Sequence, residues 1–152
     1  MSDQQATIGR DVELEISIAA PPEAVFEFLV NPDKMTRWMG TSARLDPRTD
    51  GEFWVKLGDD ATAAGRYLEV DPPNRVVLSW GWEGSEQVPP GSTNVVIELA
   101  ARDGGTTVRL VHSGLPPVED DKHLEGWTYF LDRLGIAGAG GDPDAETPTE
   151  ES

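Results

Sequence analysis

The chain has 152 residues, with 12 Lys and Arg against 28 Asp and Glu, no cysteine and a formal net charge of −16. This length corresponds to one domain that can bury a core of its own. Without cysteine there is no disulfide, no zinc–thiolate site and no thiol nucleophile. The acidic excess argues against a nucleic-acid binder, which needs clustered Lys and Arg, and against docking on an anionic membrane surface.

Both ends of the chain differ in composition from the middle. No apolar run reaches about 18 residues, and the start, Met1-Ser-Asp-Gln-Gln, has no signal-peptide pattern. We therefore expect a soluble, cytoplasmic protein with no membrane partner. Residues 1–10 are polar, and we expect them to be flexible. Residues 138–152 hold five acids and no base or aromatic residue, which predicts a disordered acidic tail after a single domain at 11–137.

Residue patterns predict one strand, two short helices and then six strands. Residues 12–18 alternate strictly between apolar and polar, as in a half-buried strand. Pro21-Pro22 opens a helix that Asn31-Pro32 ends, and Asp33 can cap a second helix ending near Trp38. Turn residues then separate strands at 41–46, 52–57, 62–70, 75–82, 92–102 and 105–113. Strands joined by such short turns pair antiparallel.

A long helix closes the predicted domain. Leu124, Trp127, Leu131 and Leu134 recur at helical spacing, and Gly135 is placed to end the helix. The fold class is therefore α+β, with one long helix facing a strongly curved antiparallel sheet. The apolar space between sheet and helix can be a packed core or a pocket, and the function depends on which it is.

Three segments resemble the START-like helix-grip superfamily, also called SRPBCC. They are Asn31-Pro-Asp-Lys-Met-Thr-Arg-Trp38, Gly51-Glu-Phe53 and Gly65-Arg-Tyr-Leu-Glu-Val-Asp-Pro-Pro-Asn-Arg75. Val76-Val-Leu-Ser-Trp-Gly-Trp82, Gly105-Thr-Thr-Val-Arg-Leu-Val-His-Ser-Gly114 and Gly126-Trp127 are similar to its bacterial AHSA-type branch, named after the activator of the ninety-kilodalton heat-shock chaperone's ATPase. The similarity extends over roughly Val12 to Gly135.

The resemblance implies a helix-grip fold. In that fold a curved seven-stranded antiparallel sheet wraps the C-terminal helix, two short helices follow the first strand, and an apolar cavity lies between sheet and helix. The superfamily includes lipid and hormone carriers, polyketide cyclases and hydroxylase subunits. The resemblance therefore indicates the fold more closely than the function.

Aromatic residues dominate the predicted inner surface. Trp80 and Trp82 lie at i and i+2 of one strand and therefore share a face, which Val76 and Leu78 continue. Such a face is either core or the aromatic wall of a pocket for a small apolar ligand. By the same parity argument Phe53 points inward and Trp54 outward.

Two histidines are placed at the same interior. His112 shares its strand parity with Val108 and Leu110 and therefore points toward the helix. Three roles stay open for it: a hydrogen-bonded structural residue, a donor that orients a ligand, and a general base. His123 lies one turn before Trp127 and is placed to meet His112 across the cavity mouth. The spacing shows no ligand pattern, so we expect no metal and no cofactor.

The candidate ligand-binding residues are Trp38, Phe53, Trp80, Trp82, His112, His123, Trp127 and Leu131. The predicted function is binding of a small hydrophobic or aromatic molecule between sheet and helix. One alternative is a cyclase or lyase acting on a hydrophobic substrate, with His112 as acid or base and Tyr129 or His123 assisting. A second alternative is a chaperone-associated protein, and a third is a domain whose interior is fully packed and binds nothing. A homodimer formed through a strand edge is compatible with all of these alternatives.

Overall fold

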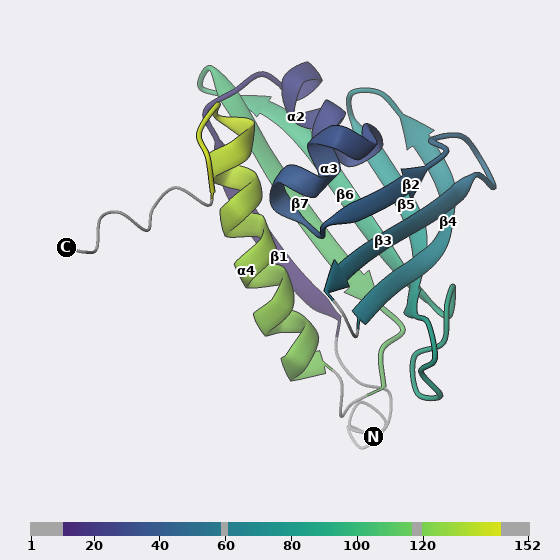
Figure 1. Ribbon diagram of the computed structural model, residues 1–152. Coiled ribbons are helices and arrows are strands. Elements are labelled where there is room, and N and C mark those ends of the chain that lie inside the picture. The colour runs from purple at the N-terminus through teal and green to yellow at the C-terminus, as the bar shows by residue number, and fades with distance from the viewer. Residues whose placement is uncertain (1–10, 59–60, 117–119, 144–152) are drawn as a thin grey trace, which may run out of the picture.

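The structure, a computed structural model, describes residues 11–58, 61–116 and 120–143 (Figure 1). Its elements are β1 (Val12–Ile18), α2 (Pro22–Val30), α3 (Pro32–Trp38), β2 (Ser42–Leu45), β3 (Glu52–Gly58), β4 (Ala61–Asp71), β5 (Arg75–Trp82), β6 (Thr93–Arg102), β7 (Gly105–Ser113) and α4 (Asp120–Gly138). The predicted element order is confirmed, and every predicted strand bound lies within one residue of the observed one. The predicted flexible N-terminus, 1–10, and residues 144–152 of the predicted tail lie outside the described residues.

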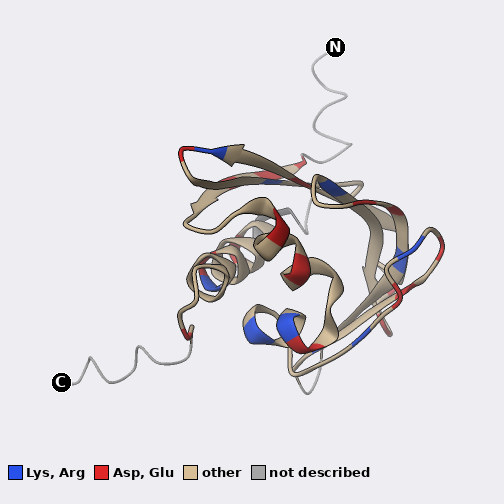
Figure 2. Cartoon of the chain, turned by 90° about the horizontal axis from the view of Figure 1, so that it is seen from above, with Lys and Arg blue, Asp and Glu red and all other residues tan. Residues whose placement is uncertain are grey.

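All strands form one antiparallel seven-stranded sheet in the order β1-β7-β6-β5-β4-β3-β2. The first strand thus pairs with the last, and Val12 lies opposite His112. Seen from above, the sheet curves round the helices (Figure 2). The α+β helix-grip fold is therefore confirmed, with α4 along the concave face and α2 and α3 at one end (Figure 1).

Helix α4 is longer than its sequence predicts. Gly135 was the expected end, but the helix continues to Gly138 because its last turns pack on β1. A Cβ added to Gly138 would lie 3.1 Å from Ile18 Cγ2, so a glycine permits this approach. The chain turns out of the helix at Gly140, which has φ of +96°, and Gly141 N donates to Ile136 O (2.8 Å). These are the features of a Schellman C-cap.

The face that α4 buries also differs by one position. Leu124 shares the predicted helical spacing of Trp127, Leu131 and Leu134, yet this residue is 40% exposed. The buried face instead runs through His123, Trp127, Leu131 and Leu134. A histidine can take the first position of this face because its ring nitrogen accepts a hydrogen bond there from Trp82.

Polar contacts join the two short helices to the rest of the molecule. Asn31, rather than Asp33, caps α3, and its Oδ1 accepts from the backbone N–H groups of Asp33 and Lys34. Trp38 Nε1 donates to Phe28 O (2.9 Å), which fixes α3 against α2. The hydroxyl of buried Tyr67, on β4, donates to a backbone carbonyl of α2 in the same way. This end of the interior is thereby filled.

The strand parity around Tyr67, open from sequence, is resolved by a register shift. Tyr67 is fully buried, whereas Leu68 is 40% exposed. The pairing of β4 with β5 shifts between Tyr67 and Glu69, as at a β-bulge, so that two consecutive residues face outward. Glu69 then forms an ion pair with Arg75 on the convex face. Exposed pairs of this kind contribute about 0–1 kcal/mol each.

Charged residues lie scattered over separate strands and helices (Figure 2). Cations are outnumbered in the sequence by more than two to one, 12 against 28. Within the described part of the chain, no helix is long and apolar enough to cross a membrane.

Candidate ligand-binding cavity

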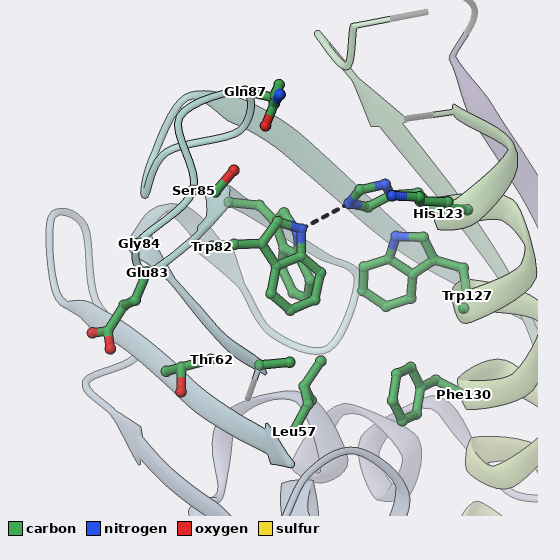
Figure 3. A pocket seen from close by; sticks show the side chains of 14 residues that line it. Leu57, Thr62, Trp82, Glu83, Gly84, Ser85, Gln87, His123, Trp127 and Phe130 are labelled. Carbon is green, nitrogen blue, oxygen red and sulfur yellow. Dashed lines mark hydrogen bonds between the residues drawn. The ribbon is translucent and has the colours of Figure 1, made fainter. Parts of the chain in front are cut away.

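A cavity of about 440 Å³ opens between β5 and the N-terminal half of α4 (Figure 3). Its volume falls in the range of roughly 300–1,000 Å³ that is typical of small-molecule sites. Four elements and the loop after β5 supply its walls. The lining residues are Leu57, Ala61, Thr62, Trp80, Trp82, Glu83, Gly84, Ser85, Gln87, Lys122, His123, Gly126, Trp127 and Phe130.

Three indole rings form the back and sides of this cavity. Trp80 lies 5.4 Å from Trp82 and 5.0 Å from Trp127, measured between ring centroids. Phe130, one turn after Trp127 on α4, points into the same space (Figure 3). Trp80 Nε1 is buried and has no hydrogen-bond acceptor among the described residues, so ring packing alone holds this side chain. The result is a wide aromatic surface.

A hydrogen bond crosses the cavity mouth. Trp82 Nε1, from β5, donates to His123 Nε2, from α4, over 2.9 Å (Figure 3). An indole nitrogen can only donate, so Nε2 of His123 must accept, and the ring is neutral with its proton on Nδ1. His123 is 7% exposed although it lines the cavity. The bond thus ties the sheet to the helix across the opening.

His112 lies behind the aromatic wall in a chain of hydrogen bonds. Trp127 Nε1 donates to His112 Nδ1 (3.0 Å), so Nδ1 is unprotonated. His112 Nε2 must then carry the proton and donate to Thr93 Oγ1 (2.7 Å). The Thr93 hydroxyl in turn donates to Trp80 O (2.8 Å). Every hydrogen in the chain is used once, and both ring nitrogens of His112 are occupied.

This arrangement decides between the roles left open for His112. Burial, followed by the neighbouring His123, lowers the pKa of His112 to about 3. A proton on Nδ1 would face the N–H of Trp127, so the protonated ring has no place in the chain. His112 is therefore a structural residue that fixes the ring of Trp127. The side chain of Tyr129, its proposed catalytic helper, is 58% exposed on the outer face of α4.

The free energy of unfolding should decrease as the pH falls below 6.5, the ordinary pKa of histidine. There the unfolded chain binds a proton that folded His112, with its pKa of about 3, does not bind. The contribution of His112 to the free energy of unfolding is complete above pH 6.5 and is lost as the pH falls toward 3. Between these values the free energy of unfolding changes by about 1.4 kcal/mol per pH unit. Urea unfolding of wild type and His112→Gln across this range isolates the effect, because all other groups titrate in both proteins. Equal slopes of the free energy of unfolding against pH in the two proteins would contradict this expectation.

The eight candidate residues separate into three groups. Trp80, Trp82, His123 and Trp127 line the cavity, and His112 supports one of them from behind. His112 and His123 do meet, with ring centroids 5.3 Å apart. The other three lie in the packed core and do not reach the cavity; they are Trp38, Phe53 and Leu131.

The reason for this separation is the filling of one end of the interior. Near Trp38 and Phe53 the side chains of Leu29 on α2, Met35 on α3 and Met39 just after α3 leave a void of only about 10 Å³. The open space is thereby confined to the other end, beside β5 and the start of α4. Sequence parity identified inward residues correctly, but inward is not the same as cavity-lining.

Several lining residues are absent from the sequence-based candidates. Leu57 shares the parity of Phe53, and Phe130 follows Trp127 by three residues, so both carried a usable signal. Ser85 and Gln87 carried no such signal, because they lie in the loop after β5, where strand and helix periodicity do not apply. That loop is held in place by Trp82 N, which donates to Val88 O (2.7 Å), and by Val88 N, which donates to Ser85 Oγ (2.9 Å).

The charged groups of the cavity lie at its rim. Glu83 and Lys122 both line it and both are exposed. Glu83 also accepts a hydrogen bond from Trp54 Nε1 (3.0 Å), on the outer side of β3. Among the residues that the structure describes, no group of three or more His, Asp or Glu side chains could hold a metal ion.

Residues 19–137 match the family model described as activator of Hsp90 ATPase homolog 1-like protein. The chain belongs to this family. The predicted AHSA-type assignment is thereby confirmed. The sequence matches none of the curated proteins with which it was compared.

Solved structures with this fold include a close sequence relative. The AHSA1-like protein RHE_CH02687 from Rhizobium etli is 46% identical, with a TM-score of 0.71, over 89% of this chain and 85% of that one. DynU16, from the dynemicin biosynthetic locus, is 26% identical with a TM-score of 0.76; the match covers 88% of this chain but only 48% of DynU16. The Aha1 dimer from Colwellia psychrerythraea is 19% identical, with a TM-score of 0.77 over 87% and 98% of the two chains, and shows the fold alone.

Proposed function

We propose that this AHSA1-like protein binds a small hydrophobic or aromatic molecule in the cavity between β5 and α4. The observation that carries the proposal is the cavity of about 440 Å³ whose walls include Trp80, Trp82 and Trp127. Burial of apolar surface stabilises a complex by about 25 cal/mol per Å² before the costs of association. Aromatic guests add offset or edge-to-face ring contacts of about 0.5–1.5 kcal/mol each.

The chain also builds this wall in advance. His112 fixes Trp127, and the packing of Trp80 against Trp82, Trp127 and Phe53 fixes Trp80. A preformed wall needs little ordering when a ligand enters, which is the general route to affinity in small sites. The charged side chains Glu83 and Lys122 lie at the rim and the buried wall is aromatic, which favours an apolar guest.

Native mass spectrometry of the freshly purified protein, compared with the denatured sample, tests for a bound guest. We expect a mass excess that disappears on denaturation. Calorimetric titration of guest-free protein with naphthalene should then show saturable binding of one molecule. A clean mass together with no binding of naphthalene would contradict the proposal.

A chaperone-associated role is the second candidate, and membership of the family is the observation that favours it. A partner of this acidic chain would need a basic surface. Pull-down with a purified ninety-kilodalton chaperone at micromolar concentration tests this role, and absence of the chaperone from the eluate would count against it. The Colwellia relative is named as a dimer, so homodimerisation is a further proposal for this chain. Light scattering after gel filtration measures the oligomeric state.

The acid–base chemistry of a cyclase or lyase finds less support. Both nitrogens of His112, the residue considered as acid or base, take part in the buried chain of hydrogen bonds. A general base needs an available acceptor within reach of the substrate proton. We therefore place binding ahead of catalysis.

A further inference from the structure

The cavity contains one polar pair set into an aromatic wall. Trp82 Nε1 and His123 Nε2 face each other over 2.9 Å, and both side chains line the cavity (Figure 3). The other polar lining groups lie differently. Glu83, Gln87 and Lys122 are exposed at the rim, and Ser85 Oγ accepts from the backbone of its own loop. His123 is buried among the lining residues, and so is Trp80, whose Nε1 donor has no acceptor among the described residues.

The two atoms have fixed and opposite hydrogen-bonding roles. The indole N–H of Trp82 can only donate, and Nε2 of His123, in the tautomer that this bond requires, can only accept. A hydroxyl group placed between them can satisfy both, because its oxygen accepts from Trp82 and its hydrogen is donated to His123. An ether or carbonyl oxygen can accept but leaves Nε2 without a donor. A carboxylate has no hydrogen to donate and brings negative charge toward the Nε2 lone pair.

We propose that the cavity selects aromatic molecules that carry a neutral hydroxyl group, which enters between Trp82 Nε1 and His123 Nε2 and replaces their direct bond. The inference rests on the proposed function and specifies its ligand class. The rings of such a molecule lie against Trp127 and Phe130, and the hydroxyl lies at the Trp82–His123 pair. One hydrogen bond is lost and two are gained, so the hydroxyl contributes one additional bond to the complex.

The surrounding packing permits the two side chains to separate. Trp82 is half-buried at the last residue of β5, and His123 lies in the first turn of α4. The main contacts of α4 are with β1 and α3, and its first turns meet β5 through side chains, His123 with Trp82 and Trp127 with Trp80. No heavy atom of another element lies within 4 Å of a Cβ built at Gly126, one turn further along. To admit one oxygen atom, the rings of Trp82 and His123 must move apart and shift against Trp80 and His112, which they contact.

Three matched probes test the inference by calorimetric titration at about pH 7.5, where phenols with a pKa near 10 remain neutral. They are 2-naphthol, 2-methoxynaphthalene and naphthalene. We expect 2-naphthol to bind wild type about three- to tenfold more tightly than the other two, the effect of one net hydrogen bond. The methyl ether keeps the ring system and the oxygen but cannot donate to His123.

Two variants remove one partner each and keep an aromatic ring. Trp82→Phe lacks the donor and His123→Phe lacks the acceptor. In His123→Phe, 2-naphthol should lose its advantage over 2-methoxynaphthalene, because both oxygens can accept from Trp82 and neither finds the His123 acceptor. In the double variant Trp82→Phe/His123→Phe its advantage over both other probes should disappear. Phe130→Ala is the matched comparison: it shortens the apolar wall, so all three probes should weaken by a similar factor and the preference should remain. Circular dichroism and urea unfolding establish that each variant is folded.

The outcomes separate this inference from the proposed function. Equal binding of all three probes by wild type overturns the hydroxyl preference and leaves the apolar cavity as a binding site. An advantage of 2-naphthol over 2-methoxynaphthalene that persists in His123→Phe, or any preference that persists in the double variant, also overturns it, because the hydroxyl is then recognised elsewhere. If wild type binds none of the probes, the inference and the proposed function are both overturned.

Discussion

Gly126→Phe is expected to weaken naphthalene binding at least about tenfold and to leave the protein folded. Gly126 lines the cavity from α4, and a Cβ built there meets no heavy atom of another element within 4 Å. The new side chain therefore extends into open space and occupies the volume that a ligand needs. In a helix interior phenylalanine is also favoured over glycine by a few tenths of a kcal/mol, so the free energy of unfolding should not fall.

Gly126→Ala provides the comparison for this variant. One methyl group leaves most of the cavity open, and alanine favours the helix over glycine by about 1 kcal/mol. We expect Gly126→Ala to bind naphthalene like wild type and to unfold at a higher urea concentration. Calorimetric titration and urea unfolding of the three proteins measure both quantities. Wild-type affinity in Gly126→Phe would mean that naphthalene binds outside this cavity.

Replacing His112 by leucine should lower the free energy of unfolding by about 2–4 kcal/mol. Leucine has a similar volume and fills the site, but Trp127 Nε1 loses its acceptor and remains buried. A buried donor without a partner costs about 1–3 kcal/mol, and imperfect packing of the new side chain adds to this. Thr93 keeps its bond to Trp80 O, so the damage centres on Trp127.

A double-mutant cycle distinguishes this cause from general loss of packing. Trp127→Phe removes the indole N–H, so the unpaired donor no longer exists in the double variant with His112→Leu. We expect a coupling free energy of about 1–2 kcal/mol between the two positions, measured by urea unfolding of all four proteins. Additive effects would contradict the hydrogen bond as the main contribution of His112.

Local residue patterns predict most of the fold. Strict alternation at 12–18, the apolar parity of Val108 and Leu110 and the turn residues between strands depend on local geometry alone, and the strands lie where these patterns put them. Helix ends depend more on tertiary contacts. Glycine at 135 was a sufficient local reason for α4 to end, but packing of the last turns on Ile18 outweighs it and moves the cap to Gly140.

The site was less accessible to sequence reasoning for a physical reason. Parity predicts which side of a strand faces inward, and it placed Trp80, Trp82 and Phe53 correctly on the concave face. Whether an inward residue lines a cavity depends on how the two short helices fill one end of the sheet, which no local pattern encodes. The structural role of His112 is likewise set by Trp127 and Thr93, on two other elements.

The indole N–H signals of the five tryptophans provide the most direct test of ligand binding in this cavity. Two-dimensional NMR spectra recorded during titration with 2-naphthol follow each indole separately. Saturable shifts should be largest for Trp80, Trp82 and Trp127, which line the cavity. Trp38, whose Nε1 is bonded to Phe28 O in the packed end, should change least. No saturable shift of the three lining indoles, or a larger shift at Trp38 than at these three, would contradict the account.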